Sequence, residues 1–86
     1  MLNENSKIYV AVVQDTAMNE RACEIVADSR QSAVYEAERW CRACDYESGG
    51  DWEVSEFYAE GIDDNAIAQI KDRVFEAGEQ FDTIYA

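Results

Sequence analysis

The first part of the chain alternates between short apolar runs and polar connections, a pattern typical of paired strands. Residues 7–14, KIYVAVVQ, are β-branched and aromatic, and they are apolar at both alternating sets of positions, which indicates a well-covered strand. The polar segment 15–20, DTAMNE, has the length of a hairpin connection. In residues 21–28, RACEIVAD, three apolar residues share one face and Glu24 lies on the other, so a half-buried second strand is predicted. The three apolar residues are Cys23, Ile25 and Ala27.

The next segment has the three-and-four spacing of an amphipathic helix. Glu38 stands four residues before Arg42, the favourable order for an ion pair on a helix surface. Ser29 is suited to cap the start of this helix, and Gly49 with Gly50 prevents its continuation. The apolar face consists of Ala33, Val34, Ala37, Trp40, Cys41 and Cys44.

A third strand is predicted at residues 52–60, WEVSEFYAE, but its alternation is broken. Trp52 and Val54 share one face, whereas Phe57 and Ala59 share the other. A bulge near Ser55-Glu56 would shift the register and remove the conflict.

A second helix follows, capped by Asp63 or Asp64, with Gly78 as the residue after its end. Residues 81–86, FDTIYA, alternate and predict a short fourth strand, with a helix that continues to residue 86 as the alternative. The order ββαβα(β) predicts one α+β domain over residues 1–86. We expect a small, mainly antiparallel sheet of three or four strands, with two helices packed on one side. The apolar stripe of the second helix is Ile67, Ile70, Val74 and Ala77.

Composition adds a large negative charge to this picture. The 86 residues include 19 acids and seven bases, which gives a net charge of −12, and there is no histidine. Such a chain repels the phosphates of nucleic acids and anionic membrane surfaces, so neither is expected as a direct partner. The natural complement is a basic protein surface. Three cysteines without a regular framework, and no apolar run of membrane-spanning length, favour a cytoplasmic protein.

The acids are concentrated in residues 45–64, DYESGGDWEVSEFYAEGIDD, which hold eight carboxylates and no Lys or Arg. Alternate residues of a strand are about 7 Å apart, close to the spacing of phosphates along one DNA strand. We therefore predict a partner-binding surface here. Its candidate residues are Asp45, Tyr46, Glu47, Asp51, Glu53, Glu56, Tyr58, Glu60, Asp63 and Asp64.

Two motifs suggest other chemistry. The sequence WCRAC at 40–44 resembles a thioredoxin-type redox site, but its cysteines fall in the last turns of the helix, where the helix dipole disfavours a thiolate. We expect Cys41 and Cys44 to be core residues. Residues 45–56 match a calcium loop at Gly50 and Glu56 but place glycine at position 5, Gly49.

Catalysis is not expected. Histidine is absent, no nucleophile turn is recognisable and no glycine-rich phosphate loop follows a strand. We therefore expect no catalytic residue, no metal ligand and no cofactor, with calcium binding by residues 45–56 as an open alternative.

The chain resembles, in size, charge and element order, small acidic phage proteins that inhibit CRISPR–Cas or restriction systems. The resemblance is carried by KIYVAVVQ, RACEIVAD, the helix 29–44 and the acidic stretch 45–64. It implies a non-catalytic inhibitor, monomer or homodimer, in the cytoplasm of a bacterial host. Such an inhibitor occupies the basic nucleic-acid-binding surface of a Cas effector or restriction enzyme by mimicking a duplex. The alternative is an acidic interaction or accessory module whose partner does not bind nucleic acid.

Overall fold

The computed structural model describes residues 6–58, 64–76 and 81–86. The order of the elements is ββαβαβ, which confirms the predicted α+β class, and the radius of gyration is 12.4 Å. None of the helices in these ranges is long and apolar enough to cross a membrane. The elements are β1 (Lys7–Gln14), β2 (Glu20–Ala27), α1 (Arg30–Ser48), β3 (Glu53–Tyr58), α2 (Asp64–Glu76) and β4 (Phe81–Tyr85).

The strands form one mixed sheet in the order β3-β1-β2-β4. The central strand β1 pairs antiparallel with both β2 and β3, whereas β4 pairs parallel to β2. The sheet is therefore mainly antiparallel, as predicted. The segment after α2 is the expected fourth strand rather than a continuing helix, and the backbone N–H of Ala86 donates to the carbonyl of Val26 at 2.9 Å.

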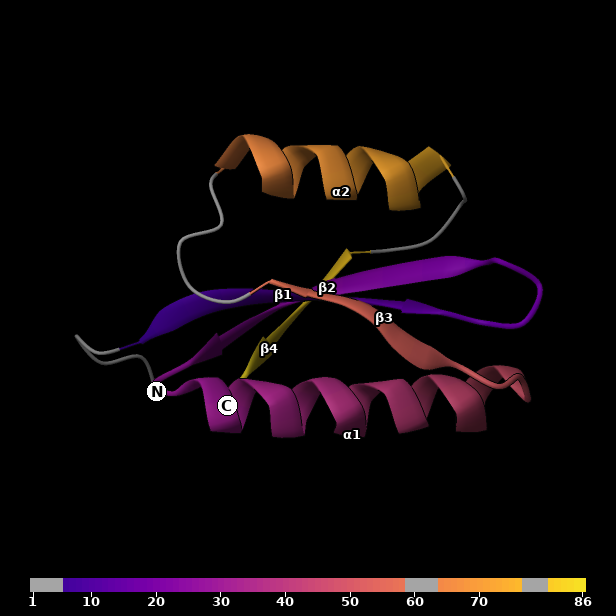
Figure 1. Ribbon diagram of the computed structural model, residues 1–86, viewed down its shortest axis with the longest axis horizontal. Coiled ribbons are helices and arrows are strands. Elements are labelled where there is room, and N and C mark those ends of the chain that lie inside the picture. Colours follow the sequence, from indigo (N-terminus) through magenta and orange to yellow (C-terminus); the bar gives the residue numbers. More distant parts are fainter. Residues whose placement is uncertain (1–5, 59–63, 77–80) are drawn as a thin grey trace.

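The two helices lie on opposite faces of the sheet (Figure 1), so the prediction that both pack on one side is wrong. The reason lies in the connections. β2, β3 and β4 all run in the same direction, because β2 and β3 are both antiparallel to β1 and β4 is parallel to β2. The connection through α1 crosses the sheet towards β3, and the connection through α2 crosses back to β4. Two right-handed crossovers that run in opposite directions must use opposite faces.

The face covered by α1 holds the larger core. Tyr9 and Ala11 of β1 are buried there, and the ring of Tyr9 is stacked on Phe57 of β3 at a centroid distance of 6.0 Å. Small side chains on α1 allow the helix to approach the sheet closely. The buried residues of this cluster are Tyr9, Ala11, Cys23, Ile25, Ala27, Ala33 and Ala37. The half-buried Trp40 packs against this cluster and also against a second one, which consists of Val13, Cys41, Cys44 and Trp52.

The face covered by α2 holds a smaller core. Val10 and Val12 of β1 and Ala22 of β2 pack against Ile70 and Val74 of the helix. The two sets of alternating residues on β1 are thus buried under different helices, which explains why KIYVAVVQ is apolar at both sets of positions between its polar ends.

Three local predictions are confirmed. The side chain of Ser29 caps α1 by accepting from the backbone N–H of Ser32 at 3.2 Å. Gly49 ends this helix in the left-handed region, with φ of 71°. A bulge leaves Ser55 without a ladder partner, because Val12 pairs with Glu56 and Val13 with Val54.

Asp64 is the first residue of α2, and the predicted roles of Ala59, Asp63, Ala77 and Gly78 fall outside the described residues.

Candidate functional site: an acidic end of the domain

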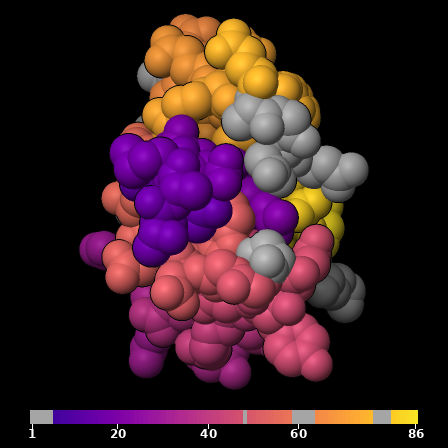
Figure 2. Space-filling model, turned by 90° about the vertical axis from the view of Figure 1, so that its right-hand side faces the viewer, coloured from indigo at the N-terminus to yellow at the C-terminus, as the bar shows by residue number. Residues whose placement is uncertain are grey.

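Three segments meet at one end of the molecule: the β1–β2 turn, the last turn of α1 and the start of β3. Figure 2 views this end and shows the turn lying over the residues around position 50. The register places Gln14 opposite Glu53, so the end of β1 meets the beginning of β3. The segments line a surface hollow of about 500 Å³. We call its four carboxylates, together with Glu47 on the last turn of α1, the acidic end: Asp15, Asp45, Glu47, Asp51 and Glu53.

Asp15 is positioned by the turn that it closes. Its Oδ1 accepts from the backbone N–H groups of Ala17 at 2.9 Å and Asn19 at 2.8 Å. Its Oδ2 accepts from Nδ2 of Asn19 at 2.9 Å. The side-chain hydrogen bond from Asn19 is the main cause that lowers the pKa of Asp15, so this exposed carboxylate is ionised at neutral pH.

Asp45 is held in place by the start of β3. Its Oδ1 accepts from the backbone N–H of Trp52 at 2.5 Å, and its carbonyl accepts from the N–H of Gly49 at 2.8 Å. The left-handed conformation of Gly49 reverses the chain after α1. Asp45 therefore connects the end of the helix to the strand that follows.

Trp52 is buried at this end, with 6% of its surface exposed, and packs against Val13, Cys41 and Cys44. The guanidinium carbon of Arg21 lies 4.8 Å from the centroid of a Trp52 ring. Nη1 of Arg21 is 4.0 Å from Oε2 of Glu47. The guanidinium of Arg21, whose side chain is 20% exposed, thus makes a cation–π contact with Trp52 and an ion pair with Glu47 of the acidic end.

The predicted partner-binding residues do not all lie together. Asp45, Glu47, Asp51 and Glu53 belong to the acidic end, and the neighbouring Tyr46 is 94% exposed. The other described members lie elsewhere. Glu56 and Tyr58 are on the face covered by α2, and Asp64 begins α2 at the opposite end of the molecule in Figure 1. Glu60 and Asp63 lie outside the described residues.

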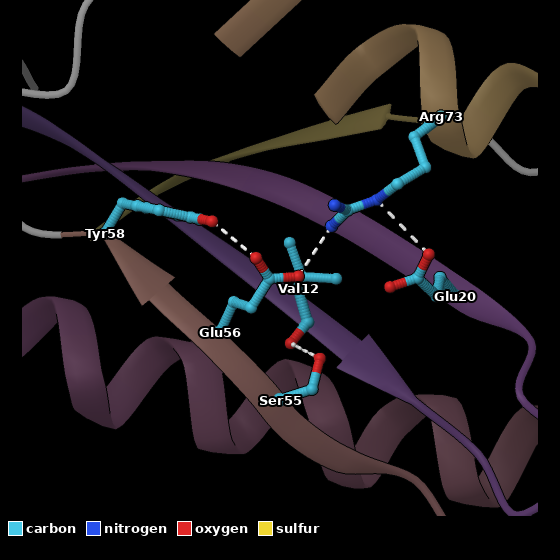
Figure 3. A network of polar contacts seen from close by, with 6 residues as sticks. All are labelled: Val12, Glu20, Ser55, Glu56, Tyr58 and Arg73. Atoms are coloured by element: carbon cyan, nitrogen blue, oxygen red, sulfur yellow. Dashed lines mark hydrogen bonds and ion pairs between the residues drawn. The ribbon is translucent and has the colours of Figure 1, made fainter. Parts of the chain in front are cut away.

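Glu56 takes part in a network under α2 rather than in the acidic end (Figure 3). Its Oε2 lies 2.6 Å from Nη2 of Arg73, and its Oε1 accepts from the hydroxyl of Tyr58. Nε of Arg73 is also 3.2 Å from Oε1 of Glu20 on β2. The hydrogen bond from Tyr58, followed by Arg73, lowers the pKa of Glu56, and the same bond raises the pKa of Tyr58.

The cysteines are packing residues, as predicted. All three lie in the described ranges, are buried and form no disulfide. Burial raises the pKa of Cys23 to about 12 and that of Cys41 to about 11, and it also raises the pKa of Cys44. These thiols are therefore protonated at neutral pH, which is unsuited to the chemistry of a redox site.

The segment proposed as a calcium loop has a different structure. Asp45 to Ser48 form the last turn of α1, and Glu56 lies in a strand and is bound to Arg73. Within residues 6–58, 64–76 and 81–86, no group of three or more His, Cys, Asp or Glu is arranged to hold a metal ion.

Asp15 is the member of the acidic end that sequence reasoning missed, because it lies 30 residues before the acidic stretch. The strand pattern held the relevant signal: an antiparallel pairing of strand 7–14 with the strand after Trp52 brings residue 15 beside residue 53.

Comparisons of the chain with protein-family models, with curated proteins and with solved structures found no match.

Proposed function

We propose that the protein is a non-catalytic acidic inhibitor that binds the basic nucleic-acid-binding surface of a bacterial defence complex, a Cas effector or a restriction enzyme. In this proposal the acidic end replaces the phosphates of a duplex. The observation that carries the proposal is the gathering of five carboxylates, from three separate segments, at one end of an 86-residue chain with a net charge of −12.

The charge density supports this proposal. The domain measures 38 × 26 × 18 Å, so its end is about 26 Å across. A duplex of that length carries roughly 15 phosphates, of which a protein on one side meets about half. The five carboxylates of the acidic end supply about two thirds of this number.

The fixed geometry of the acids also supports mimicry. Asp15 and Asp45 are held by backbone N–H groups, so little side-chain entropy is lost when a partner binds them. The exposed ring of Tyr46 lies next to these acids and offers anchoring area of the kind found at binding hot spots.

The test is competition for a basic partner. Purified protein is added to Cas effectors and restriction enzymes bound to a fluorescent duplex, and release of the duplex is followed by anisotropy. A mimic releases the duplex and is itself displaced by excess unlabelled DNA. Because the interaction depends on charge, its affinity is expected to fall steeply with salt. An accessory module, by contrast, would bind its partner without competing with DNA.

Charge reversal identifies the surface. Asp51→Lys with Glu53→Lys is expected to weaken inhibition at least 30-fold, since truncating one member of a partly desolvated charge pair costs roughly 2 to 5 kcal/mol. Asp28→Lys with Asp72→Lys is the control, because it makes the same change in net charge at two exposed sites outside the acidic end. Equal loss of inhibition in both variants would show that only net charge matters, and unchanged inhibition in the first variant would place the interface elsewhere.

A further inference from the structure

The strand β4 forms one edge of the sheet, and this edge is regular and carries little charge. Its residues, FDTIY, pair with β2 in an unbroken parallel register, and Asp82 is the only charged residue among them. Within residues 6–58, 64–76 and 81–86, no strand pairs with its outer side. An open edge can pair with a strand of another chain, which is why proteins usually protect edge strands with charges, prolines or bulges.

The opposite edge of the sheet, β3, is protected in these ways. A bulge at Ser55 breaks the regular spacing of the strand, and Glu53 and Glu56 place two acids among its six residues. β4 contains no bulge and no proline. Of these two edges, that of β4 is therefore the one suited to pairing with another strand.

The backbone of β4 fixes the register that such a pairing takes. The N–H of Ala86 donates to the carbonyl of Val26 on β2 at 2.9 Å. Backbone groups alternate in direction along a strand, so those of residues 82 and 84 also point towards β2 and those of the other three residues point outwards. The residues with outward-pointing groups are Phe81, Thr83 and Tyr85.

These outward groups match those of a second copy. In an antiparallel pairing centred on Thr83, this residue exchanges both of its backbone hydrogen bonds with the Thr83 of the second copy. Phe81 of each copy exchanges them with Tyr85 of the other. Every outward backbone group of β4 then has a partner.

The same register suits the side chains. Phe81 packs on the face covered by α2, so Thr83 and Tyr85 point to that face as well. There Phe81 of one copy lies opposite Tyr85 of the other, which makes an aromatic cross-strand pair. On the other face, Asp82 lies opposite Ile84, so no two carboxylates are directly opposed. The strand is thus complementary to itself.

Two exposed aromatic side chains also come together in this arrangement. Phe75 is 56% exposed and Tyr85 is 63% exposed. Nζ of Lys71 lies 5.0 Å from the centroid of the Phe81 ring, so this side of α2 faces β4, and Phe75 follows one turn later on the same side. Because α2 ends shortly before β4 begins, Phe75 lies at the end of β4 where Tyr85 of the second copy is placed.

We propose that two copies of the chain associate by antiparallel pairing of their β4 edges, about a two-fold axis at Thr83. The two four-stranded sheets become one sheet of eight strands. A basic strand of another protein fits this edge less well, because it meets a single carboxylate on β4 whereas five are gathered at the acidic end. β4 begins beside the start of β2, so the two acidic ends of the dimer point in opposite directions.

The association is tested by sedimentation velocity at about 10 to 500 µM protein, in about 150 and 500 mM NaCl. We expect a monomer–dimer equilibrium that is tighter at the higher salt concentration, since screening weakens the repulsion between two chains of charge −12. The binding of a basic partner has the opposite salt dependence, so the two proposals fail independently.

A charge placed on the two-fold axis identifies the interface. Thr83→Lys is expected to weaken association at least 10-fold, because it puts two ammonium groups directly opposite each other although it lowers the net negative charge. Gln69→Lys is the matched control, since it makes the same charge change on the side of α2 that lies beside Tyr58 and Arg73. This control is expected to leave the dissociation constant within twofold. Circular dichroism verifies that each variant is folded.

Crosslinking tests the register and does not depend on the lysine variant. Hydrogen-bonded partners in antiparallel strands have Cα atoms about 5.5 Å apart, a distance that a disulfide can span. With oxidised glutathione, Thr83→Cys is expected to give a disulfide-linked dimer, and Val54→Cys on the β3 edge is expected to remain monomeric. The proposal is overturned if the chain stays monomeric at about 500 µM at both salt concentrations. It is also overturned if the two lysine variants weaken association equally, or if Val54→Cys is crosslinked and Thr83→Cys is not.

Discussion

Nη2 of Arg73 on α2 lies 2.6 Å from Oε2 of Glu56 on β3, and this contact ties the smaller core to an edge of the sheet. Through Nε the same guanidinium also reaches Glu20 on β2 at 3.2 Å. β1 runs between these two strands, so Arg73 bridges across the central strand above Val12 (Figure 3). One acid of the 45–64 stretch is thus paired within the domain.

Removing this bridge is expected to destabilise the protein. Arg73→Ala should lower the free energy of unfolding by about 1 to 2 kcal/mol, because hydrogen bonds to charged groups contribute about this much and the arginine is partly exposed. Arg39→Ala is the matched control, since its pairing distance of 3.7 Å on the surface predicts a change below about 0.5 kcal/mol. Urea unfolding measures both. Equal losses would show that the bridge adds nothing beyond a surface arginine.

Stability is expected to depend on the protonation of Glu56. Its pKa is lowered in the folded state from the ordinary value of 4.5, so its contribution is complete above that value and is lost as the pH falls through the lowered pKa. The melting temperature between pH 7 and 3 should therefore decline less steeply in Glu56→Gln than in the unchanged protein. Tyr58→Phe should give an intermediate slope, because it removes the hydrogen bond that lowers the pKa most but leaves Arg73. Identical slopes in all three proteins would contradict this account.

The cysteines are expected to be unreactive in the folded protein. Cys23 is fully buried, and the raised pKa values of all three thiols leave little thiolate at pH 8. Labelling with a thiol reagent should be slow in buffer and complete in denaturant. Cys41→Ala and Cys44→Ala should each cost about 1 to 2 kcal/mol of stability through lost packing. Rapid labelling of either residue in buffer would revive a redox role for WCRAC.

Calcium is expected to have no specific effect. Millimolar Ca²⁺ should raise the melting temperature no more than Mg²⁺ does, because screening of the −12 charge is common to both ions. Asp45 and Glu56, the first and last positions of the proposed loop, are already bound to the backbone of Trp52 and to Arg73. A calcium-specific rise of many degrees that is lost in Glu56→Gln would restore the calcium hypothesis.

Local features of the fold followed from the sequence, because they depend on near neighbours. The cap at Ser29, the stop at Gly49 and the bulge at Ser55 each depend on a few adjacent residues. Which face of the sheet each helix covers depends on the order of the strands, and no short stretch of sequence contains that order. The pattern of KIYVAVVQ nevertheless held the relevant information: a strand that is apolar on both faces needs cover on both, and this favours helices on opposite sides.

The candidate site was predictable only where the chain stays local. Asp45, Glu47, Asp51 and Glu53 come together because a short turn joins α1 to β3. The positions of two other acids depend on pairing between strands that are far apart in the sequence. Asp15 joins the acidic end through the β1–β3 ladder, and Glu56 is turned towards Arg73 by the bulge before it. Counting charges along residues 45–64 could not distinguish an acid that faces solvent from one that is bound inside the domain.

The parallel pairing of β4 with β2 sets the order in which the molecule can be assembled during synthesis. β1 and β2 are joined by a tight turn and can form a hairpin as soon as both have left the ribosome. Roughly fifty residues separate β2 from β4, so these two strands can pair only late, after α1, β3 and α2 have been made. Until then the outer edge of β2 stays open, and this is the stage at which the nascent chain is most exposed to pairing with other chains.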